Sequence, residues 1–497
     1  MFSIPDDLKP FERYRSIIDD IAAFNAALRR PLPKFIWTNI LRTTPESLDD
    51  KLGRDGIRLS PLPWYAGGFQ VTSGEERLGK HWTYMAGHYQ VQEASAMLPV
   101  LLLGPQPGDR VLDLCAAPGM KTAQMALAMR NRGTIVANDP AYSRMRSVRM
   151  HVDRLGLLNV SMTIYDGSSY PRAAGTFDAV LADVPCSCEG TSRKTPTVAD
   201  RVEADRTTIV RKQIAILTSA VRRCRPGGRI VYSTCTYAPE ENEAVVDAVV
   251  RQMPEAVRIL PVQLKEFQTT PGLADWKGTT YHPGMTQTAR IWPHHNDTGG
   301  FFMALLEKRE AGPGKNLRSA AITGPDGNNA DDFEMAGATE NDKDYVGILT
   351  ERYGIDAAAF SGLRLVSKNK REICIVAGDH RPPLKPESAT GLPLMHKKMR
   401  YPKLTTAGAI QFGRTAGRNV IDVNRSQLTD YLSRRPFRLE AGQDRLCDGG
   451  GHVLIRHQGA VLGVGNYQGQ NRIVESFFPK HLAVDSATDI IQSHSSM

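Results

Sequence analysis

The sequence predicts an α/β protein built around a doubly wound parallel sheet, with a small α/β module before it and a β-rich region after it. The main observation is an alternation of apolar strand-like and amphipathic helix-like segments over residues 110–308, which is typical of a sheet covered by helices on both faces. Beyond this stretch, short apolar runs separated by glycine predict strands joined by turns. We therefore expect four parts, at residues 1–100, 101–310, 311–344 and 345–497.

The N-terminal module begins with apolar residues at helical spacing over residues 10–30, which predict one amphipathic helix. Two prolines near residue 32 end this pattern, and residues 36–41 have the composition of a strand. Thr44 and Pro45 then predict a second helix, because threonine is a favoured cap and proline is favoured at the first helical position.

The central part is expected to contain six parallel strands and four helices. The strands are predicted at residues 111–114, 134–137, 160–165, 179–182, 229–233 and 301–306, and the helices at 120–130, 142–155, 206–223 and 240–252. In sheets of this class ligands bind at the carboxyl ends of the strands.

The C-terminal third differs in composition and charge. Residues 311–344 are rich in Gly, Asn and Asp and predict a flexible linker. Residues 452–456 and 460–464 are expected to pair through a turn at Gln458-Gly459. The net charge of +9 arises mostly after the linker, where 21 Lys and Arg face 13 Asp and Glu. This excess suits a polyanionic partner such as nucleic acid, and equally suits a plain solvated surface.

Length and cysteine usage limit the class of protein. The 497 residues are enough for two or three domains. We expect a cytoplasmic protein away from membranes, because no apolar run of membrane-spanning length occurs and the N-terminus does not resemble a signal peptide. Seven cysteines, an odd number, indicate reduced thiols. Cys186 and Cys188 form a CxC pair, but no second pair follows at zinc spacing, so no metal site is expected.

A loop of small residues follows the first central strand and predicts a cofactor site. It comprises Cys115, Ala116, Ala117, Pro118, Gly119, Met120 and Lys121. Such a loop lets backbone N–H groups at a helix N-terminus approach a ligand closely. It lacks the GxxxxGK[ST] and GxGxxG patterns of phosphate and dinucleotide sites, so a cofactor with an amino-acid end and a nucleoside fits better.

Three acids, Asp139, Asp166 and Asp183, follow successive predicted strands. An acid after the second strand of such a sheet is placed to accept hydrogen bonds from ribose hydroxyls, and the next can reach a base amino group. Any one of them alone is explained about as well as a helix cap.

Two cysteines, Cys186 and Cys235, also follow predicted strands and are expected to face one cleft. A single cysteine is usually an inert buried thiol, whereas two in polar settings beside a cofactor loop favour catalysis. A thiolate that adds to carbon 6 of cytosine makes carbon 5 able to attack a sulfonium methyl group, and Asp183 is placed to steady the adduct. The target base must be unstacked or single-stranded for this reaction.

Five motifs in order now give a resemblance to a known family: CAAPGMK, the acids Asp139 and Asp166, DVPCSCEGT, YSTCTYAPEENE and RIWPHHNDTGGFFMALLEK. Over residues 10–308 the chain resembles the Nop/Sun family of RNA cytosine-5 methyltransferases, especially its bacterial 16S ribosomal RNA members. The C-terminal region is similar in kind to the PUA-like, RNA-binding appendages of those members.

The resemblance implies a Rossmann-like methyltransferase domain between two RNA-binding parts, acting as a monomer on RNA, with 16S ribosomal RNA favoured. It implies that S-adenosyl-L-methionine is held by the loop from Cys115 to Lys121, by Asp139 at the ribose and by Asp166 near the adenine, with Arg144 as a further contact. It also implies that Cys235 is the nucleophile and that Cys186 assists breakdown of the adduct. Asp183 and Lys121 would line the catalytic centre.

The chain departs from the family pattern DAPCSG at two positions, with Val184 for alanine and Cys188 for glycine. Three alternatives remain open at this point. Cys186 is the nucleophile in the rival assignment, because DNA cytosine-5 methyltransferases use a Pro-Cys nucleophile. Transfer RNA is the rival substrate, and a non-catalytic RNA-binding ribosome-assembly factor is the rival class of protein.

Overall fold

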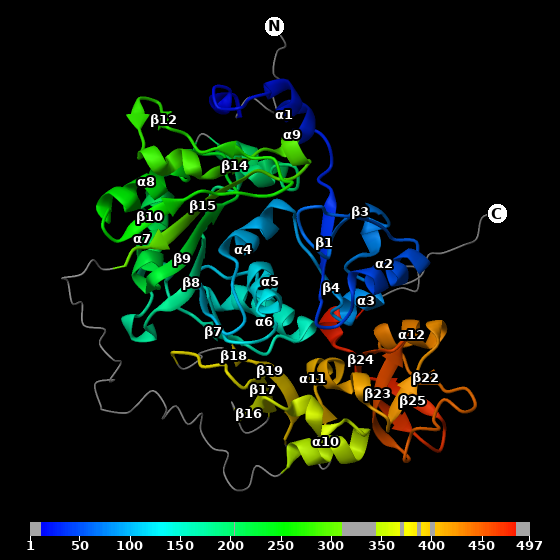
Figure 1. Ribbon diagram of the computed structural model, residues 1–497. Coiled ribbons are helices and arrows are strands. Elements are labelled where there is room, and N and C mark those ends of the chain that lie inside the picture. The colour runs from blue at the N-terminus through cyan, green and yellow to red at the C-terminus, as the bar shows by residue number, and fades with distance from the viewer. Residues whose placement is uncertain are drawn as a thin grey trace, which may run out of the picture.

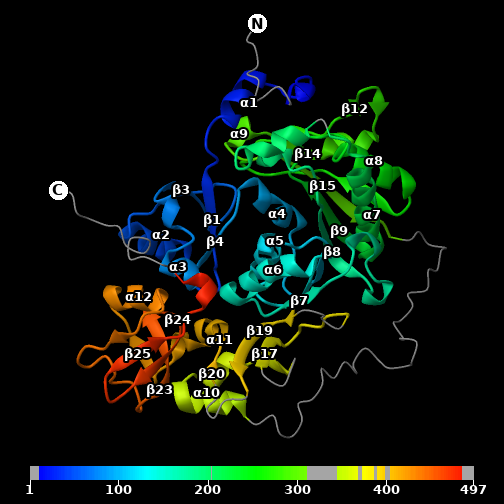
Figure 2. The same ribbon diagram turned by 180° about the vertical axis from the view of Figure 1, so that it is seen from behind.

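The computed structural model describes residues 11–202, 204–310, 344–367, 372–384, 389–397 and 403–483. The expected linker at 311–344 lies outside the described residues except for Asp344, which caps α10 (Tyr345–Tyr353). In Figure 1 the N-terminal module lies beside the central sheet and the C-terminal region lies below both, and the view from behind in Figure 2 agrees. Within these described ranges, no helix has the length and apolar character needed to span a membrane.

The central sheet has the strand order β11-β14-β15-β9-β8-β5-β6-β7-β18, with β10 beside β15. Its main strands are β5 (Arg110–Asp113), β6 (Thr134–Asn138), β7 (Val160–Thr163), β8 (Phe177–Asp183), β9 (Cys224–Thr234) and β15 (Phe301–Lys308). Shorter strands are β10 (Val257–Leu260), β11 (Thr270–Pro271) and β14 (Ala289–Ile291), and β12 (Asp275–Trp276) pairs with β13 (Thr279–Thr280) apart from the sheet.

The prediction that all six strands are parallel is wrong for β15. Strands β5 to β9 are parallel, but β15 runs antiparallel to both β9 and β14. Apolar periodicity identifies a strand without giving its direction. The connection from β14 to β15 is also too short for the crossover that parallel neighbours require.

Helices cover both faces of this sheet, as predicted. α4 (Leu98–Leu103), α5 (Met120–Ala128) and α6 (Tyr142–Leu155) pack on one face, and α7 (Thr207–Arg223) and α8 (Glu243–Gln252) on the other. Alternate strand residues enter opposite cores: Val111 packs with α4 to α6, and Leu112 packs with α7 and α8. The two apolar cores therefore bury the middle of the sheet on both faces and leave its strand ends for function.

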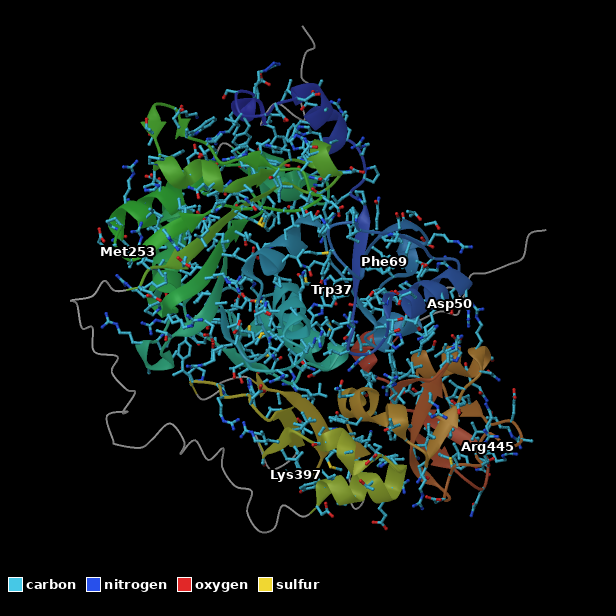
Figure 3. The ribbon with its side chains drawn as sticks, in the orientation of Figure 1. Trp37, Asp50, Phe69, Met253, Lys397 and Arg445 are labelled. Carbon is cyan, nitrogen blue, oxygen red and sulfur yellow. The ribbon has the colours of Figure 1, made fainter. Side chains whose placement is uncertain are left out.

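The N-terminal module contains an antiparallel sheet of order β2-β3-β1-β4, formed by β1 (Lys34–Thr38), β2 (Arg58–Pro61), β3 (Gly68–Ser73) and β4 (Tyr89–Val91). α2 (Pro45–Arg54) starts at Thr44 as predicted, and α3 (Trp82–Met85) precedes β4. Trp37 faces the core of the central domain, whereas Phe69 packs within the module (Figure 3). The two faces of this small sheet therefore serve different cores.

The predicted helix over residues 10–30 is wrong in its first half. α1 (Ile21–Leu28) begins at Asp20, whose side chain accepts a hydrogen bond from the Ala23 N–H at 2.8 Å. Residues 11–14 instead form a 3₁₀ turn that places Phe11 and Tyr14 in the central core, each ring against Tyr237. Aromatic packing therefore decides this segment rather than helical periodicity.

The described residues of the C-terminal region form two sheets and three α-helices, so this part is less purely β than predicted. The four-stranded sheet consists of β16 (Leu363–Ser367), β17 (Glu372–Ala377), β19 (Leu392–His396) and β20 (Lys403–Leu404). The five-stranded sheet consists of β21 (Val420–Asp422), β22 (Phe437–Arg438), β23 (Gly451–His457), β24 (Ala460–Gln468) and β25 (Ile473–Ser476). α10 is joined by α11 (Thr406–Phe412) and α12 (Arg425–Leu432). The predicted hairpin of β23 and β24 is confirmed, with Gln458 and Gly459 at φ 47° and 78° in its turn.

The C-terminal region is also tied to the two other parts. β18 (Ala389–Thr390) adds to the edge of the central sheet beside β7, where the Ser161 and Thr390 hydroxyl oxygens lie 2.7 Å apart. The ring of Trp82 from the N-terminal module packs edge-on against His457, with centroids 5.2 Å apart. Residues 345–497 therefore share both a sheet and a core with earlier residues.

Candidate active site

The carboxyl ends of β5, β6, β8 and β9 lie at one edge of the central sheet and border a cavity of about 420 Å³. The predicted site residues that line it are Cys115, Ala117, Pro118, Lys121, Asp139, Asp166, Asp183, Cys186 and Cys235, together with Arg144. Ala116, Gly119 and Met120 belong to the same loop without lining the cavity. The fold therefore brings most of the predicted site residues together.

The loop between β5 and α5 has its shape fixed from both sides. The Ala116 N–H donates to the Asn138 carbonyl at 2.8 Å. Gly119 has φ 110°, and a Cβ at this position would lie 2.8 Å from Cα of Val148 in α6. Glycine is therefore required for the close approach of α5 and α6. The first turn of α5 has no side-chain cap, so its N–H groups remain available to a ligand.

Asp139 is buried at the end of β6, although its side chain borders the cavity. One carboxylate oxygen accepts from the Ala141 N–H at 3.0 Å and the other lies 3.2 Å from an Arg144 nitrogen. Arg144 also donates to the Ala117 carbonyl at 3.0 Å. Arg144 therefore connects the acid to the cofactor loop, which makes it a positioning residue as well as part of the lining.

Asp166 caps the short 3₁₀ turn that follows it. Its Oδ1 accepts from the Ser168 N–H at 2.9 Å and from the Ser168 hydroxyl at 2.8 Å. These two hydrogen bonds lower the pKa of Asp166. Asp166 therefore both caps this turn and lines the cavity.

Asp183 ends β8 and joins two residues of the site. Its Oδ2 accepts from Lys121 Nζ at 2.7 Å and its Oδ1 accepts from the Ser233 hydroxyl at 2.7 Å. Burial alone would lower the pKa of Lys121, but the Asp183 carboxylate reverses this effect and raises it. Lys121 is therefore held as a cation beside the ends of β8 and β9.

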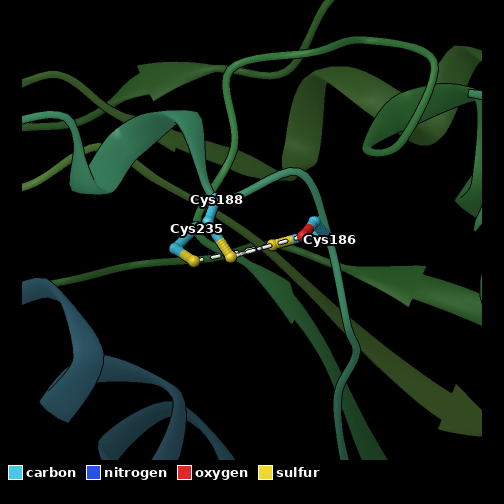
Figure 4. A group of neighbouring side chains, drawn as sticks. All are labelled: Cys186, Cys188 and Cys235. Atoms are coloured by element: carbon cyan, nitrogen blue, oxygen red, sulfur yellow. Dashed lines mark hydrogen bonds between the residues drawn. The ribbon is translucent and has the colours of Figure 1, made fainter. Parts of the chain in front are cut away.

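The thiols of Cys186 and Cys235 meet as predicted, with 3.5 Å between their sulfur atoms. A third thiol, Cys188, lies 3.9 Å from Cys186, and Figure 4 shows all three sulfur atoms pointing toward one another. The contacts from Cys188 and Cys235, together with burial, raise the pKa of Cys186. The contact from Cys186 lowers the pKa of Cys235, but the Cys188 contact and burial outweigh it and raise the pKa overall. Both thiols are therefore protonated at neutral pH until a ligand changes their surroundings.

A buried charge network behind the thiols was not predicted. Glu241 accepts from the Ser187 N–H at 2.9 Å and from Gln213 Nε2 at 2.9 Å, and it lies 3.2 Å from Arg206 Nε. Arg206 also pairs with Glu189, which accepts from the Tyr14 hydroxyl at 2.8 Å. This network holds the segment that carries Cys186. The acidic run at Glu240-Glu241 in the YSTCTYAPEENE motif was a usable signal, but its buried partners are remote in sequence.

The loop of Cys186 and the segment after Cys235 are also joined directly. The Ser187 and Thr236 hydroxyl oxygens are 2.7 Å apart, and the Gly190 N–H donates to the Cys235 carbonyl at 2.9 Å. A Cβ on Gly190 would lie 2.2 Å from the Gly300 carbonyl oxygen, so this crossing of backbones requires glycine. The distance between the two thiols is therefore set by the backbone.

Asp113, at the end of β5, is a second residue that the sequence analysis missed. Its Oδ2 accepts from the Thr122 hydroxyl at 2.7 Å, but its Oδ1 is buried and has no partner among the described residues. Complete burial raises the pKa of Asp113 to about 7. The carboxyl group is therefore mostly protonated below neutral pH and donates or accepts within the sheet edge as a neutral group.

We expect Asp113 to make stability fall as pH rises. The folded protein retains a proton that the unfolded chain, with a pKa of 3.8, has already released. Stability is therefore lost between about pH 4 and about pH 7, by on the order of 4 kcal/mol from this residue. Asp113→Asn removes this contribution, so urea unfolding should show the variant gaining on the wild type as pH rises from 5 to 8. An equal difference at both pH values would contradict the assignment.

The sequence of this chain is similar to those of known RNA methyltransferases. A family model described as 16S rRNA methyltransferase RsmB/F matches residues 100–307. The chain is 37% identical over 297 residues to the 28S rRNA (cytosine(4447)-C(5))-methyltransferase of Homo sapiens, which covers 59% of this chain and 36% of that protein. It is 31% identical over 478 residues to the ribosomal RNA small subunit methyltransferase F of Vibrio atlanticus, which covers 94% of each chain.

The fold agrees with a solved structure of a methyltransferase homolog protein from Pyrococcus horikoshii. The TM-score is 0.55 at 29% identity, covering 62% of this chain and 100% of that one. These matches confirm the Rossmann-like methyltransferase fold and the resemblance to the Nop/Sun methyltransferases. The chain spans only 36% of the human relative but nearly the whole of the Vibrio relative. It therefore belongs to the RsmB/F family of 16S rRNA methyltransferases.

Proposed function

We propose that the protein transfers a methyl group from S-adenosyl-L-methionine to carbon 5 of a cytosine in RNA, through a covalent adduct between Cys235 and carbon 6. The observation that carries this proposal is the 3.5 Å approach of Cys235 and Cys186 beside a cavity that Asp139, Asp166 and Asp183 also line. Family membership supports the same reaction. The two thiols come from different strands, so no single local motif accounts for their meeting.

The residues around the cavity fit S-adenosyl-L-methionine, which supplies an electrophilic methyl group when bound. The uncapped start of α5 offers N–H groups to the carboxylate of an amino-acid end. Asp139 offers carboxylate oxygens to ribose hydroxyls, and Asp166 borders the same space where an adenine amino group would lie. The volume of about 420 Å³ is in the range of small-molecule sites.

Cys235 is the better candidate for the nucleophile. The interaction of the Lys121 ammonium with the Cys235 sulfur is among the causes that raise the pKa of Lys121, so this ammonium favours a thiolate at Cys235, whereas the Asp183 carboxylate opposes it. Cys186 instead lies between the two other thiols, whose contacts favour its neutral form. Once a base displaces these thiol contacts, Cys235 is the sulfur with a cation beside it.

The steps of the reaction on the cytosine ring are assigned to residues that line the cavity. The Cys235 thiol gives its proton to water, the thiolate adds to carbon 6, and the electron pair of the double bond between carbons 5 and 6 moves to carbon 5, where it attacks the methyl group. Asp183 accepts a hydrogen bond from the exocyclic amine of the ring. After carbon 5 has gained the methyl group, its proton passes to water, the electron pair of that C–H bond re-forms the double bond between carbons 5 and 6, the bond to Cys235 breaks, and the sulfur leaves as a thiolate. Cys186, 3.5 Å from that sulfur, is placed to assist this release. Lys121 and Asp183 keep the charge of the centre balanced throughout.

Ribosomal RNA of the small subunit is the favoured substrate. The match to the Vibrio small subunit methyltransferase extends through the C-terminal region, which carries most of the net positive charge of this chain. We propose that this PUA-like region and the N-terminal module bind RNA by contacts to its phosphates and place a single-stranded cytosine at the cavity. Transfer RNA is the main rival.

Methyl transfer onto RNA tests this function directly. Purified protein with radiolabelled S-adenosyl-L-methionine should label small-subunit RNA from a strain that lacks the gene, and bisulfite sequencing should locate a new 5-methylcytosine. Labelling of transfer RNA alone would replace the substrate assignment. Absence of labelling in any RNA or ribosomal subunit, with retained RNA binding, would favour the non-catalytic assembly factor.

Asp139→Ala should weaken binding of S-adenosylhomocysteine by about 10- to 100-fold in isothermal titration calorimetry. This size corresponds to the loss of hydrogen bonds to a charged acceptor. Asp139→Asn, which keeps the size of the side chain and an acceptor for the Ala141 N–H, should lose less. Wild-type affinity in the alanine variant would show that Asp139 does not hold the ribose.

A further inference from the structure

The three thiols at the cavity have the spacing of a metal site that the linear sequence conceals. Their sulfur atoms all lie within 4.8 Å of one another, with 3.5 Å between Cys186 and Cys235 and 3.9 Å between Cys186 and Cys188. A tetrahedral zinc ion bound at about 2.3 Å from each sulfur places its ligands about 3.8 Å apart. The three thiols drawn in Figure 4 therefore need only small side-chain movements to bind one zinc ion together.

Cys188 is the residue that completes this set, and its backbone is unusual. It has φ 64°, in the left-handed region that favours glycine. A side chain in this region costs about 1 kcal/mol or more relative to glycine. The cysteine therefore gives up backbone stability and contributes one thing that glycine lacks, a third thiol aimed at Cys186 and Cys235.

The surroundings also suit a cation. All three cysteines are partly exposed and line the cavity, so an ion can enter and a fourth position remains open to water. Three thiolates around a divalent ion carry a net negative charge, and the Lys121 ammonium lies beside this group. Thiolates are the form of cysteine that binds a metal ion, so metal binding releases protons from thiols.

We propose that Cys186, Cys188 and Cys235 bind one thiophilic divalent cation such as Zn²⁺, with the fourth coordination position open to the cavity. Soft thiolate ligands select this class of ion over Mg²⁺ or Ca²⁺. The binding site itself is independent of the proposed function. Its consequence rests on that function, because an ion that holds the Cys235 sulfur blocks addition to cytosine and inhibits methyl transfer reversibly.

Cadmium binding to the full chain tests the site without an activity assay. In the presence of a non-chelating phosphine reductant, one equivalent of Cd²⁺ should produce the ultraviolet charge-transfer band of cadmium–thiolate bonds, and calorimetry gives the affinity. Cys188→Gly, which introduces a residue that suits φ 64°, should weaken binding by about 100-fold or more. The matched control is Cys447→Ser, which removes a partly exposed thiol of the C-terminal region and should leave the affinity unchanged.

The activity readout compares each variant with its own metal-free rate. Zn²⁺ should inhibit the wild type at low concentration, a chelator should restore the rate, and Cys188→Gly should require about 100-fold more Zn²⁺. Equal Cd²⁺ affinity in wild type and Cys188→Gly would overturn the proposal, as would loss of two titratable thiols to a disulfide without metal uptake. If the protein binds cadmium through thiolates but methylates no RNA, the proposed function is contradicted and the metal site is still supported.

Discussion

Cys235→Ala should abolish both methyl transfer and the covalent adduct with RNA. Removal of the nucleophile from an enzyme that uses covalent catalysis lowers the rate by on the order of 10⁴-fold or more. The remaining groups still bind the substrate, but without the adduct carbon 5 is not activated for methyl transfer. The measurement is single-turnover methyl transfer together with denaturing gel electrophoresis of protein incubated with RNA and S-adenosyl-L-methionine. A band shifted by the mass of the RNA should be missing for this variant.

Cys186→Ala is the matched variant and should behave in the opposite way. With Cys235 intact, the adduct forms, but its breakdown slows, so the shifted band should accumulate while turnover falls. If the adduct instead persists in Cys235→Ala and disappears in Cys186→Ala, the roles of the two cysteines must be exchanged. Unchanged affinity for S-adenosylhomocysteine in both variants would show that the cofactor site has survived the substitutions.

The edge of the central sheet was predictable because strand periodicity and strand ends are local features. Apolar runs before Asp139 and Asp183 marked β6 and β8, and parallel strands place their carboxyl ends together. The same reasoning predicted that Cys186 and Cys235 face one cleft, and their sulfur atoms lie 3.5 Å apart. The antiparallel direction of β15 lay outside this reasoning, since periodicity has no direction.

Features that depend on remote partners were not predictable. β18 joins β7 through a pairing of Ala389 with Met162, and a run of two residues carries no strand signal of its own. The buried partners of Glu241 are equally distant along the chain. Cys188 was noted as a departure from the family pattern, but the CxC spacing alone argued against a metal. The group of three thiols is completed by Cys235, which lies 49 residues beyond Cys186 and is brought close only by the fold.

Glu241→Ala should have the largest effect on stability among single substitutions near the site. Glu241 is fully buried, and its carboxylate serves Arg206, Gln213 and the Ser187 N–H at once. Its removal leaves buried donors without an acceptor and breaks a buried ion pair, which costs about 3–5 kcal/mol. The segment that carries Cys186 should also loosen, so methyl transfer should fall even under conditions where the variant remains folded.

The neighbouring residue provides the control for this substitution. Glu240 pairs with Arg13 nearer the surface, where its side chain is 35% exposed, so Glu240→Ala should cost about 1 kcal/mol or less. Urea unfolding of both variants separates the two contributions, and Glu241→Gln distinguishes charge from shape because it keeps the volume and one acceptor. A cost below about 1 kcal/mol for Glu241→Ala would mean that the Ser187–Thr236 contact and the Gly190 backbone bond hold the two thiols together without the buried charge network.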